Sequence, residues 1–99
     1  MAAELRFTTE AESDVAEAYE WYEARAVGLG EQFLASLDAQ LESIAGSPLL
    51  YQRVYQEFRR ALVRRFPYAI FFEFTEDRVM VFAVFHTARD PRKWRQRAS

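Results

Sequence analysis

The chain has 99 residues, of which 51% are hydrophobic and 16% aromatic, so we expect one folded domain over residues 1–99 and not a disordered chain. It contains no cysteine, which excludes disulfides and thiolate chemistry and fits a reducing cytoplasm. Its longest apolar run, residues 79–85, is far shorter than the roughly 20 residues that a membrane helix needs.

The net charge of −2 conceals a strong asymmetry along the chain. Residues 1–50 carry ten acids and two arginines, whereas residues 51–99 carry eleven basic residues and five acids. Twelve of the thirteen basic residues are arginine, whose planar guanidinium suits carboxylate and phosphate better than lysine does. We therefore expect one acidic surface and one basic surface on the same domain.

The first half predicts a short strand followed by a helix. Residues 5–8 alternate as a strand does, and Thr9 with Glu12 has the spacing of a capping box, which predicts a helix over about residues 10–26. Asp14 falls in its first turn, where the helix dipole favours an acid. Apolar residues at helical spacing mark the face expected to be buried: Val15, Ala18, Tyr19, Tyr22 and Ala26.

A second helix is predicted after Gly28 and Gly30, which we expect to end the first one. Its apolar positions have helical spacing and stop at Gly46, with Pro48 two residues later. These positions are Phe33, Leu34, Leu37, Leu41 and Ile44. Two such helices joined by a few residues form an antiparallel hairpin, and the apolar connection over residues 48–56 is expected to pack.

Three strands are predicted in the second half, over residues 58–65, 68–75 and 78–86. In the middle strand one face is apolar: Tyr68, Ile70, Phe72 and Phe74. The last strand is apolar on both faces, with Met80, Phe82 and Val84 alternating with Val79, Val81 and Phe85. It should be central, or its second face should be covered by the tail or by a partner.

Residues 88–97 could add a helical turn around Trp94. The order strand, helix, helix, strand, strand, strand predicts an α+β domain in which a helical hairpin packs on a mainly antiparallel sheet.

Two segments bracket the hydrophobic hairpin of strands. The first runs Arg59-Arg60-Ala61-Leu62-Val63-Arg64-Arg65-Phe66-Pro67-Tyr68, and the second reads His86-Thr87-Ala88-Arg89-Asp90-Pro91-Arg92-Lys93-Trp94. Together with the acidic first helix, they resemble the RelE/ParE superfamily of toxins from type II toxin–antitoxin modules, in its ParE-like branch. The resemblance covers nearly the whole chain.

The resemblance implies a growth-inhibiting toxin of a plasmid-stabilisation module, with a cognate antitoxin as partner, DNA gyrase as target and no cofactor. It leaves two alternatives open. One is a RelE-like endoribonuclease, which cleaves mRNA on the ribosome without a metal, and the other is a degenerate member retained only as an antitoxin-binding partner.

A nuclease would need a base, an acid and cations for the phosphate. The candidates are His86, the only histidine, together with Arg60, Arg65 and Arg89. The other interpretation of His86 is that it bonds to the backbone where its strand ends. RelE-like enzymes use lysine and tyrosine, but the only lysine here is Lys93 and no tyrosine follows Tyr68. One histidine and scattered carboxylates predict no metal site.

The other candidate binding residues are arginines and one tryptophan. Alternation along the predicted strand places Arg59 and Arg65 on one face and Arg60 and Arg64 on the other. Their partners would be glutamates of the helices, acidic residues of the antitoxin, or the target. Trp94 is either a core residue or a stacking platform. Arg97 is a further candidate for contact with the target or the antitoxin. Arg89 and Asp90 could form an internal pair.

More apolar surface is predicted on the sheet than two helices can cover. Phe71, Val79, Val81 and Phe85 are expected to be left for the second face, and Trp21 lies outside the buried stripe of its helix. Such patches mark partner sites. We expect the antitoxin to cover them and the isolated chain to self-associate or to be poorly soluble.

Overall fold

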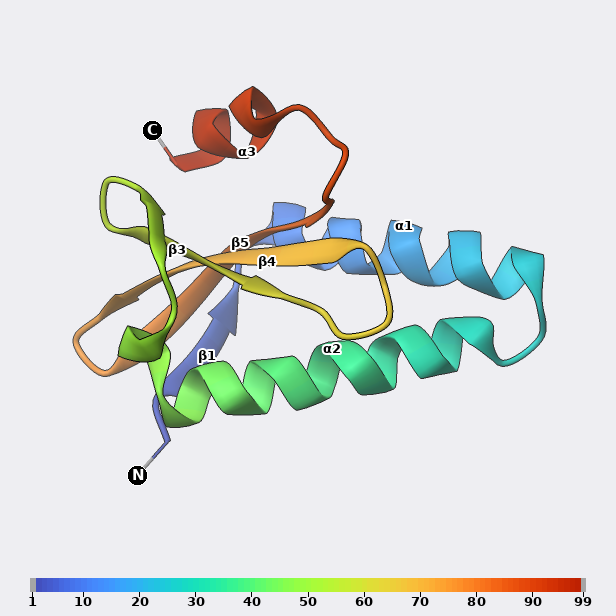
Figure 1. Ribbon diagram of the computed structural model, residues 1–99, viewed down its shortest axis with the longest axis horizontal. Coiled ribbons are helices and arrows are strands. Elements are labelled where there is room, and N and C mark those ends of the chain that lie inside the picture. Colours follow the sequence, from blue (N-terminus) through green and yellow to red (C-terminus); the bar gives the residue numbers. More distant parts are fainter. Residues whose placement is uncertain (1, 99) are drawn as a thin grey trace.

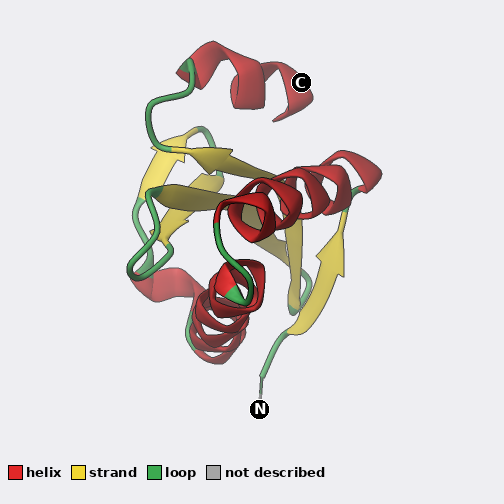
Figure 2. Ribbon diagram, turned by 90° about the vertical axis from the view of Figure 1, so that its right-hand side faces the viewer, coloured by secondary structure: helices red, strands yellow, loops and turns green. Residues whose placement is uncertain are grey.

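The computed structural model describes residues 2–98 as three layers, with a helical hairpin on one face of a sheet and a short helix on the other (Figures 1 and 2). The five strands lie in the order β1-β5-β4-β3-β2. The helices are α1 (Thr9–Arg25), α2 (Leu29–Gly46) and α3 (Pro91–Ala98). The strands are β1 (Glu4–Phe7), β2 (Arg53–Tyr55), β3 (Phe58–Leu62), β4 (Tyr68–Thr75) and β5 (Arg78–His86).

This architecture confirms the predicted α+β domain, with two additions. β1 is parallel to β5, whereas the other pairs are antiparallel. The connection after α2 holds a 3₁₀ turn at Pro48–Leu50 and the three-residue strand β2, which the sequence analysis missed. A strand this short has too few alternating residues to be recognised.

The hairpin of α1 and α2 is held by caps that differ from those predicted. Thr8, not Thr9, caps α1, because its Oγ1 accepts the N–H of Ala11 at 3.1 Å. The predicted N-cap position was therefore wrong by one residue. The helix ends at Arg25, so Ala26 lies outside it and is exposed.

Gly28 and Gly30 serve the start of α2 rather than the end of α1. The carboxylate of Glu23 accepts the N–H groups of both glycines at 2.9 Å, which satisfies donors at the beginning of the helix. Gly28 has φ +88°, a conformation that favours glycine. At Gly30 a Cβ atom would lie 2.8 Å from the ring of Tyr19, so glycine lets the two helices approach here.

The main core lies between the hairpin and the sheet. Phe33 and Ile44 of α2 pack there with the predicted face of β4, and Tyr22 of α1 contacts Phe33 and Phe66 through its ring. Ile70 and Phe72 are fully buried, and Tyr68 and Phe74 are partly buried against the same cluster. The predicted apolar face of β4 is thus confirmed.

The predicted faces of β5 were wrong because the strand contains a bulge. Phe71 pairs with Ala83 and Phe72 with Val81, so the residue between these partners has no counterpart on β4. The extra residue shifts the alternation by one. Val84 therefore joins Val79 and Val81 in the main core, whereas Phe82 and Phe85 lie on the outer face.

The outer face of the sheet is covered by α3. The indole of Trp94 stacks on Phe71, with 4.3 Å between ring centroids, and also contacts Phe82. Phe71, Phe82, Phe85 and Trp94 are all buried. The expectation that this face is left open for a partner is therefore wrong for the chain by itself, and the core interpretation of Trp94 is the one that the packing supports.

One buried carboxylate joins α1, β5 and α3. The side chain of Asp14 is 5% exposed; its Oδ2 accepts the N–H of Val84 at 3.0 Å and its Oδ1 accepts a guanidinium N–H of Arg97 at 3.0 Å. The same guanidinium donates to the carbonyl of Phe82 at 3.3 Å. Since β1 pairs with β5 only as far as Val81, Asp14 and Arg97 satisfy backbone groups at the bulge that no strand reaches.

We predict that Asp14→Ala lowers the free energy of unfolding by about 3 kcal/mol, because it leaves a largely buried guanidinium and a buried N–H without an acceptor. Urea denaturation followed by circular dichroism measures the change. Glu17→Ala, an exposed position on the same helix, should change it by less than about 0.5 kcal/mol. Equal stabilities of the two variants would contradict this role of Asp14.

Candidate functional site

A small groove lies between α3 and the outer face of the sheet, with a volume of about 180 Å³; we call it the α3 groove. Phe71, Phe85 and Trp94 supply apolar walls. Its charged lining is entirely basic, from Arg60 of β3, Arg89 of the loop before α3 and Arg95 of α3. No carboxylate is among the described residues that line it, so the groove favours an anionic partner.

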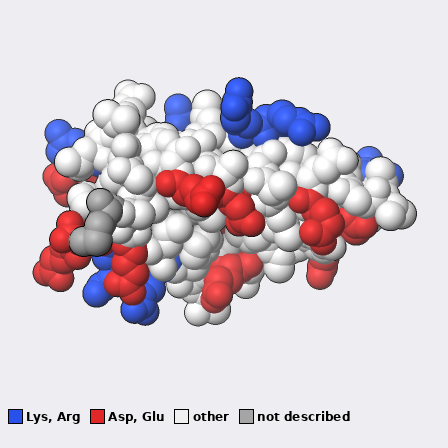
Figure 3. Space-filling model, turned by 90° about the horizontal axis from the view of Figure 1, so that it is seen from below, with Lys and Arg blue, Asp and Glu red and all other residues white. Residues whose placement is uncertain are grey.

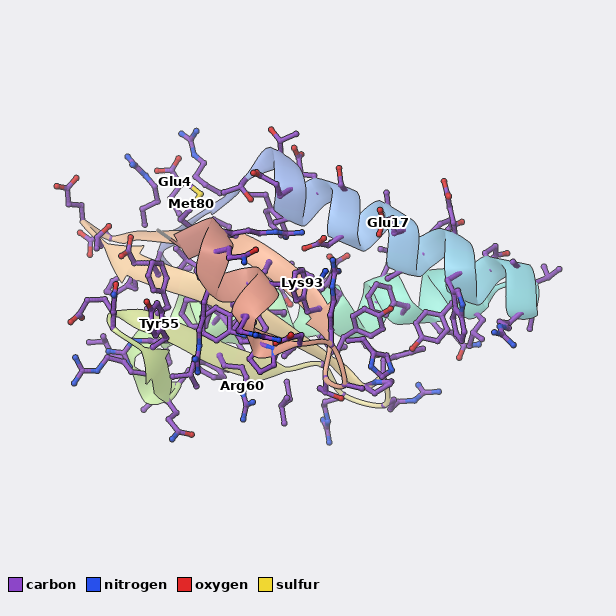
Figure 4. The ribbon with its side chains drawn as sticks, turned by 90° about the horizontal axis from the view of Figure 1, so that it is seen from above. Glu4, Glu17, Tyr55, Arg60, Met80 and Lys93 are labelled. Carbon is purple, nitrogen blue, oxygen red and sulfur yellow. The ribbon has the colours of Figure 1, made fainter. Side chains whose placement is uncertain are left out.

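The guanidinium groups of the α3 groove are positioned by aromatic rings. That of Arg89 lies 3.9 Å from the ring centroid of Phe85, and that of Arg95 lies 5.1 Å from Tyr55. Such cation–π contacts orient an arginine without neutralising it. Arg60, which pairs with Phe71 across the sheet, extends from the exposed side of β3 (Figure 4). The three arginines are thus available to bind anionic groups.

His86 stands at the end of β5 and lines the same groove. Its Nδ1 accepts the N–H of Ala88 at 3.0 Å, and its ring meets that of Tyr68 edge-on. The hydrogen bond to Ala88 is of the kind expected if His86 bonds to the backbone where its strand ends. In the neutral imidazole the accepting Nδ1 carries no proton, so Nε2 carries it.

Arg64 and Arg65 do not continue β3, so the predicted strand over residues 58–65 was too long. β3 ends at Leu62, and Arg65 has φ +71° in the turn that buries Phe66 beneath Tyr22. The predicted alternation of the four arginines over two strand faces is therefore wrong. Arg65 reaches α2 instead, where it donates to the Oε1 of Gln32 at 3.5 Å.

The fold therefore divides the candidate residues. It brings His86, Arg60, Arg89 and Trp94 together in the α3 groove. Arg64 and Arg65 lie beside α2, in a polar cavity of about 470 Å³. The remaining candidates are engaged elsewhere: Arg59 donates to the carbonyl of Tyr51 at 2.6 Å, and Arg97 pairs with Asp14.

The proposed internal pair of Arg89 with Asp90 does not form. Asp90 pairs with Arg92 at 2.8 Å, and the hydrogen bonds from Arg92 lower the pKa of its carboxyl. Arg89 instead lies over Phe85. The sequence analysis missed Arg95, which also lines the groove. Its position next to Trp94 could have indicated it, because the residue beside a buried tryptophan is brought close to the groove.

Neither a metal site nor a membrane helix is found in the part of the chain that the structure describes. No three histidine, cysteine, aspartate or glutamate side chains of residues 2–98 are grouped so that they could hold a metal ion. Within the same range, no helix combines the length and apolarity that crossing a membrane requires.

Comparisons with known proteins identify the family. Residues 5–91 match the model of a family described as the ParE toxin of the type II toxin–antitoxin system parDE. The fold is similar to that of a chain in a solved structure titled "Chromosomal ParDE TA system from P. aeruginosa", with a TM-score of 0.73 and 13% sequence identity over 86% of this chain and 96% of that one. No curated protein gave a significant match. The chain belongs to the ParE toxin family of type II toxin–antitoxin systems.

We predict that the neutral imidazole of His86 carries its proton on Nε2, because Nδ1 accepts a backbone hydrogen bond. Long-range ¹H–¹⁵N correlation spectra distinguish the two tautomers of this single histidine. A dominant Nδ1–H form would show that the bond to Ala88 is not made. His86→Ala should remain folded, since the side chain is exposed.

Proposed function

We propose that this toxin inhibits DNA gyrase by binding to it, and that the α3 groove is the contact surface. The observation that carries the proposal is the composition of the groove, which combines three arginines with buried aromatic walls. Arginine is enriched among the residues that contribute most to binding at protein interfaces. A groove with no carboxylate fits an acidic surface of the target.

The groove is poorly equipped for catalysis. Cleavage of RNA requires one group that removes a proton and another that donates one. Among the described residues that line the groove, His86 is the one side chain of the type that most often transfers protons in catalysis. Its Nδ1 is already occupied by the backbone of Ala88. This arrangement supports a toxin that acts by contact.

A second candidate function is ribosome-dependent cleavage of mRNA. It is favoured by one observation: His86, Arg60 and Arg89 line the same groove, where an imidazole could act beside two cations. Arg65, the fourth candidate for this role, lies beside α2 and would take no part.

We predict that Arg60→Glu and Arg89→Glu each weaken inhibition of gyrase supercoiling by purified toxin at least tenfold, because each places a carboxylate in a basic groove. Arg64→Glu changes the net charge equally outside the groove and should inhibit as the unmodified chain does. The measurement is a supercoiling titration with purified gyrase.

Failure of the unmodified toxin to inhibit gyrase would contradict the proposal. Primer extension on translating ribosomes then tests the second candidate function. Codon-phased cuts that disappear in His86→Ala would establish the endoribonuclease instead.

A cognate antitoxin is the partner that the family implies. We propose that acidic residues of this antitoxin contact Arg59, Arg60, Arg64 and Arg65. Arg60 is on the outer side of β3, whereas Arg65 lies beside α2. A segment that contacts both would pass around the edge of the sheet formed by β2 and β3, which an extended antitoxin segment that folds on binding could do.

We predict that Arg60→Glu and Arg65→Glu each weaken the complex with the antitoxin by more than about 1 kcal/mol, the upper range for an exposed ion pair. Isothermal titration calorimetry measures the affinity. Arg78→Glu, at the start of β5, is the matched charge control and should bind as the unmodified chain does. Unchanged affinity of both variants would rule out these contacts.

A further inference from the structure

A separate cleft lies between α1 and the paired ends of β4 and β5, with a volume of about 500 Å³; we call it the α1 cleft. One wall is formed by Asp14, Glu17 and Trp21, which lie three and four residues apart and so share one face of α1. The other wall includes Tyr68 at the start of β4 and His86 at the end of β5. Neither proposed contact of the toxin uses the α1 wall.

Four aromatic rings line the α1 cleft in a continuous row. The ring centroids of Trp21 and Tyr22 lie 5.0 Å apart, and those of Tyr22 and Tyr68 lie 6.0 Å apart. The row ends at His86, whose ring centroid is 5.4 Å from that of Tyr68. Trp21, at the other end, is 52% exposed, which confirms that it lies outside the buried stripe of α1 and makes its ring available to a partner.

The rings of the row offer more hydrogen-bond donors than acceptors. An indole only donates, a tyrosine hydroxyl can donate, and His86 keeps a proton on Nε2 because its Nδ1 accepts the N–H of Ala88. Burial raises the pKa of Tyr68, so its hydroxyl remains a donor at neutral pH. The carboxylate of Asp14 already holds a backbone N–H and a guanidinium. A ligand that fits therefore supplies carbonyl oxygens and few N–H groups.

We propose that the α1 cleft binds a proline-rich segment of a partner protein in the polyproline II conformation, with a basic residue beside the prolines. Such a segment has no internal hydrogen bonds, so its carbonyl oxygens are free to accept from the ring donors. Proline has no N–H, so it brings no donor that the cleft would leave unpaired. Two residues of this helix rise about 6 Å, close to the 5.0 to 6.0 Å that separate neighbouring rings of the row.

Glu17 sets the charge of the proposed segment. It is exposed on α1, one turn before Trp21 (Figure 4). Figure 3, which is turned toward the helical side of the molecule, shows acidic side chains distributed over this face with uncharged surface between them. A basic residue beside the prolines is therefore attracted by Glu17 and by the acidic helices around it.

The two ends of the α1 cleft also fix the direction of the segment. Arg89 is the one arginine among the described residues that line the cleft, and its guanidinium lies over the ring of Phe85. The basic residue of the segment therefore belongs at the Glu17 end. Trp21 is suited to that neighbour, because it already holds the guanidinium of Arg25 at 4.0 Å from its ring centroid.

Other occupants fit the α1 cleft less well. A helical segment uses its carbonyl oxygens internally, so it would leave the ring donors unpaired. A second copy of this chain offers no proline-rich segment, because its three prolines, Pro48, Pro67 and Pro91, are far apart in the sequence. The occupant therefore comes from a different protein.

The α1 cleft can be tested without changing the α3 groove. The two sites share His86 and Arg89, but Glu17 and Trp21 line the α1 cleft alone. Variants at these two positions should therefore leave inhibition of gyrase as it is in the unmodified chain. The proposal does not depend on whether the target is gyrase or mRNA.

The first experiment measures binding of a synthetic peptide, an arginine followed by a run of prolines, to the purified full-length chain. Of the two tryptophans, Trp94 is buried, so a change in emission reports on Trp21. We expect the emission to shift to shorter wavelength as the peptide covers the indole. A peptide in which alanine replaces every proline should bind at least tenfold more weakly.

The second experiment removes the exposed ring. Trp21→Ala takes away the outer end of the aromatic row, whereas Val27→Ala shortens a side chain that is 97% exposed and outside the cleft. In calorimetric titrations with the proline peptide, we expect affinity to fall at least tenfold for Trp21→Ala and to stay within twofold for Val27→Ala.

The third experiment reverses the charge. Glu17→Lys should weaken binding of the proline peptide at least fivefold more than Glu20→Lys, an equivalent reversal at an exposed position of α1 outside the cleft. The difference should shrink at high salt because exposed charges are screened. A peptide that begins with glutamate instead of arginine should recover binding to Glu17→Lys.

The outcomes separate the proposals. Equal binding of the proline and alanine peptides, or unchanged affinity of Trp21→Ala, would overturn the assignment of the α1 cleft. A dimer of the free chain that Trp21→Ala dissociates in sedimentation analysis would identify a second copy as the occupant and overturn it too. Loss of gyrase inhibition in Trp21→Ala would assign this ring to the target contact instead. A chain that binds the peptide as expected but does not inhibit gyrase would contradict the proposed function and leave the cleft assignment standing.

Discussion

The carboxylate of Asp14 is the interaction on which the arrangement of this molecule depends. It accepts a backbone N–H at the bulge of β5 and holds the guanidinium of Arg97, so one side chain fixes the position of α1 on the sheet and of α3 on the opposite face. Burying a charge is unfavourable unless it is paired and hydrogen-bonded, and here both conditions are met. Trp94, on the same helix as Arg97, stacks on Phe71, and both rings form walls of the α3 groove.

The two halves of the chain give the folded toxin two chemically different sides. The acidic first half forms the hairpin of α1 and α2, whereas the arginine-rich second half includes β3, the loop before α3 and α3 itself. The net charge of −2 reveals neither the acidic side nor the basic side. A protein with this distribution can discriminate between partners by sign of charge at each surface, so that a basic and an acidic partner segment need not compete for one site.

Local patterns in the sequence predicted the helices and the three longer strands, because periodicity determines these features. His86 and Arg89, two of the candidate residues, line one groove because only two residues separate them in the chain. The failures share a different cause. The bulge of β5 depends on its pairing with β4, the end of β3 depends on burial of Phe66, and the role of Asp14 depends on Arg97, far away in the chain. Such tertiary constraints override local preference, and a strand pattern contains no signal for them.

The parallel pairing of β1 with β5 has a consequence for the timing of folding. Glu4 pairs with Arg78 and Phe7 with Val81, so the first strand finds its neighbour only after most of the chain exists. Contacts between such distant segments carry a loop-closure cost and form late. During synthesis the helical hairpin emerges first, but the sheet that it covers is not yet present. A nascent chain therefore cannot complete its sheet until β5 has been synthesised, and α3, which follows β5, packs on the outer face of the sheet later still.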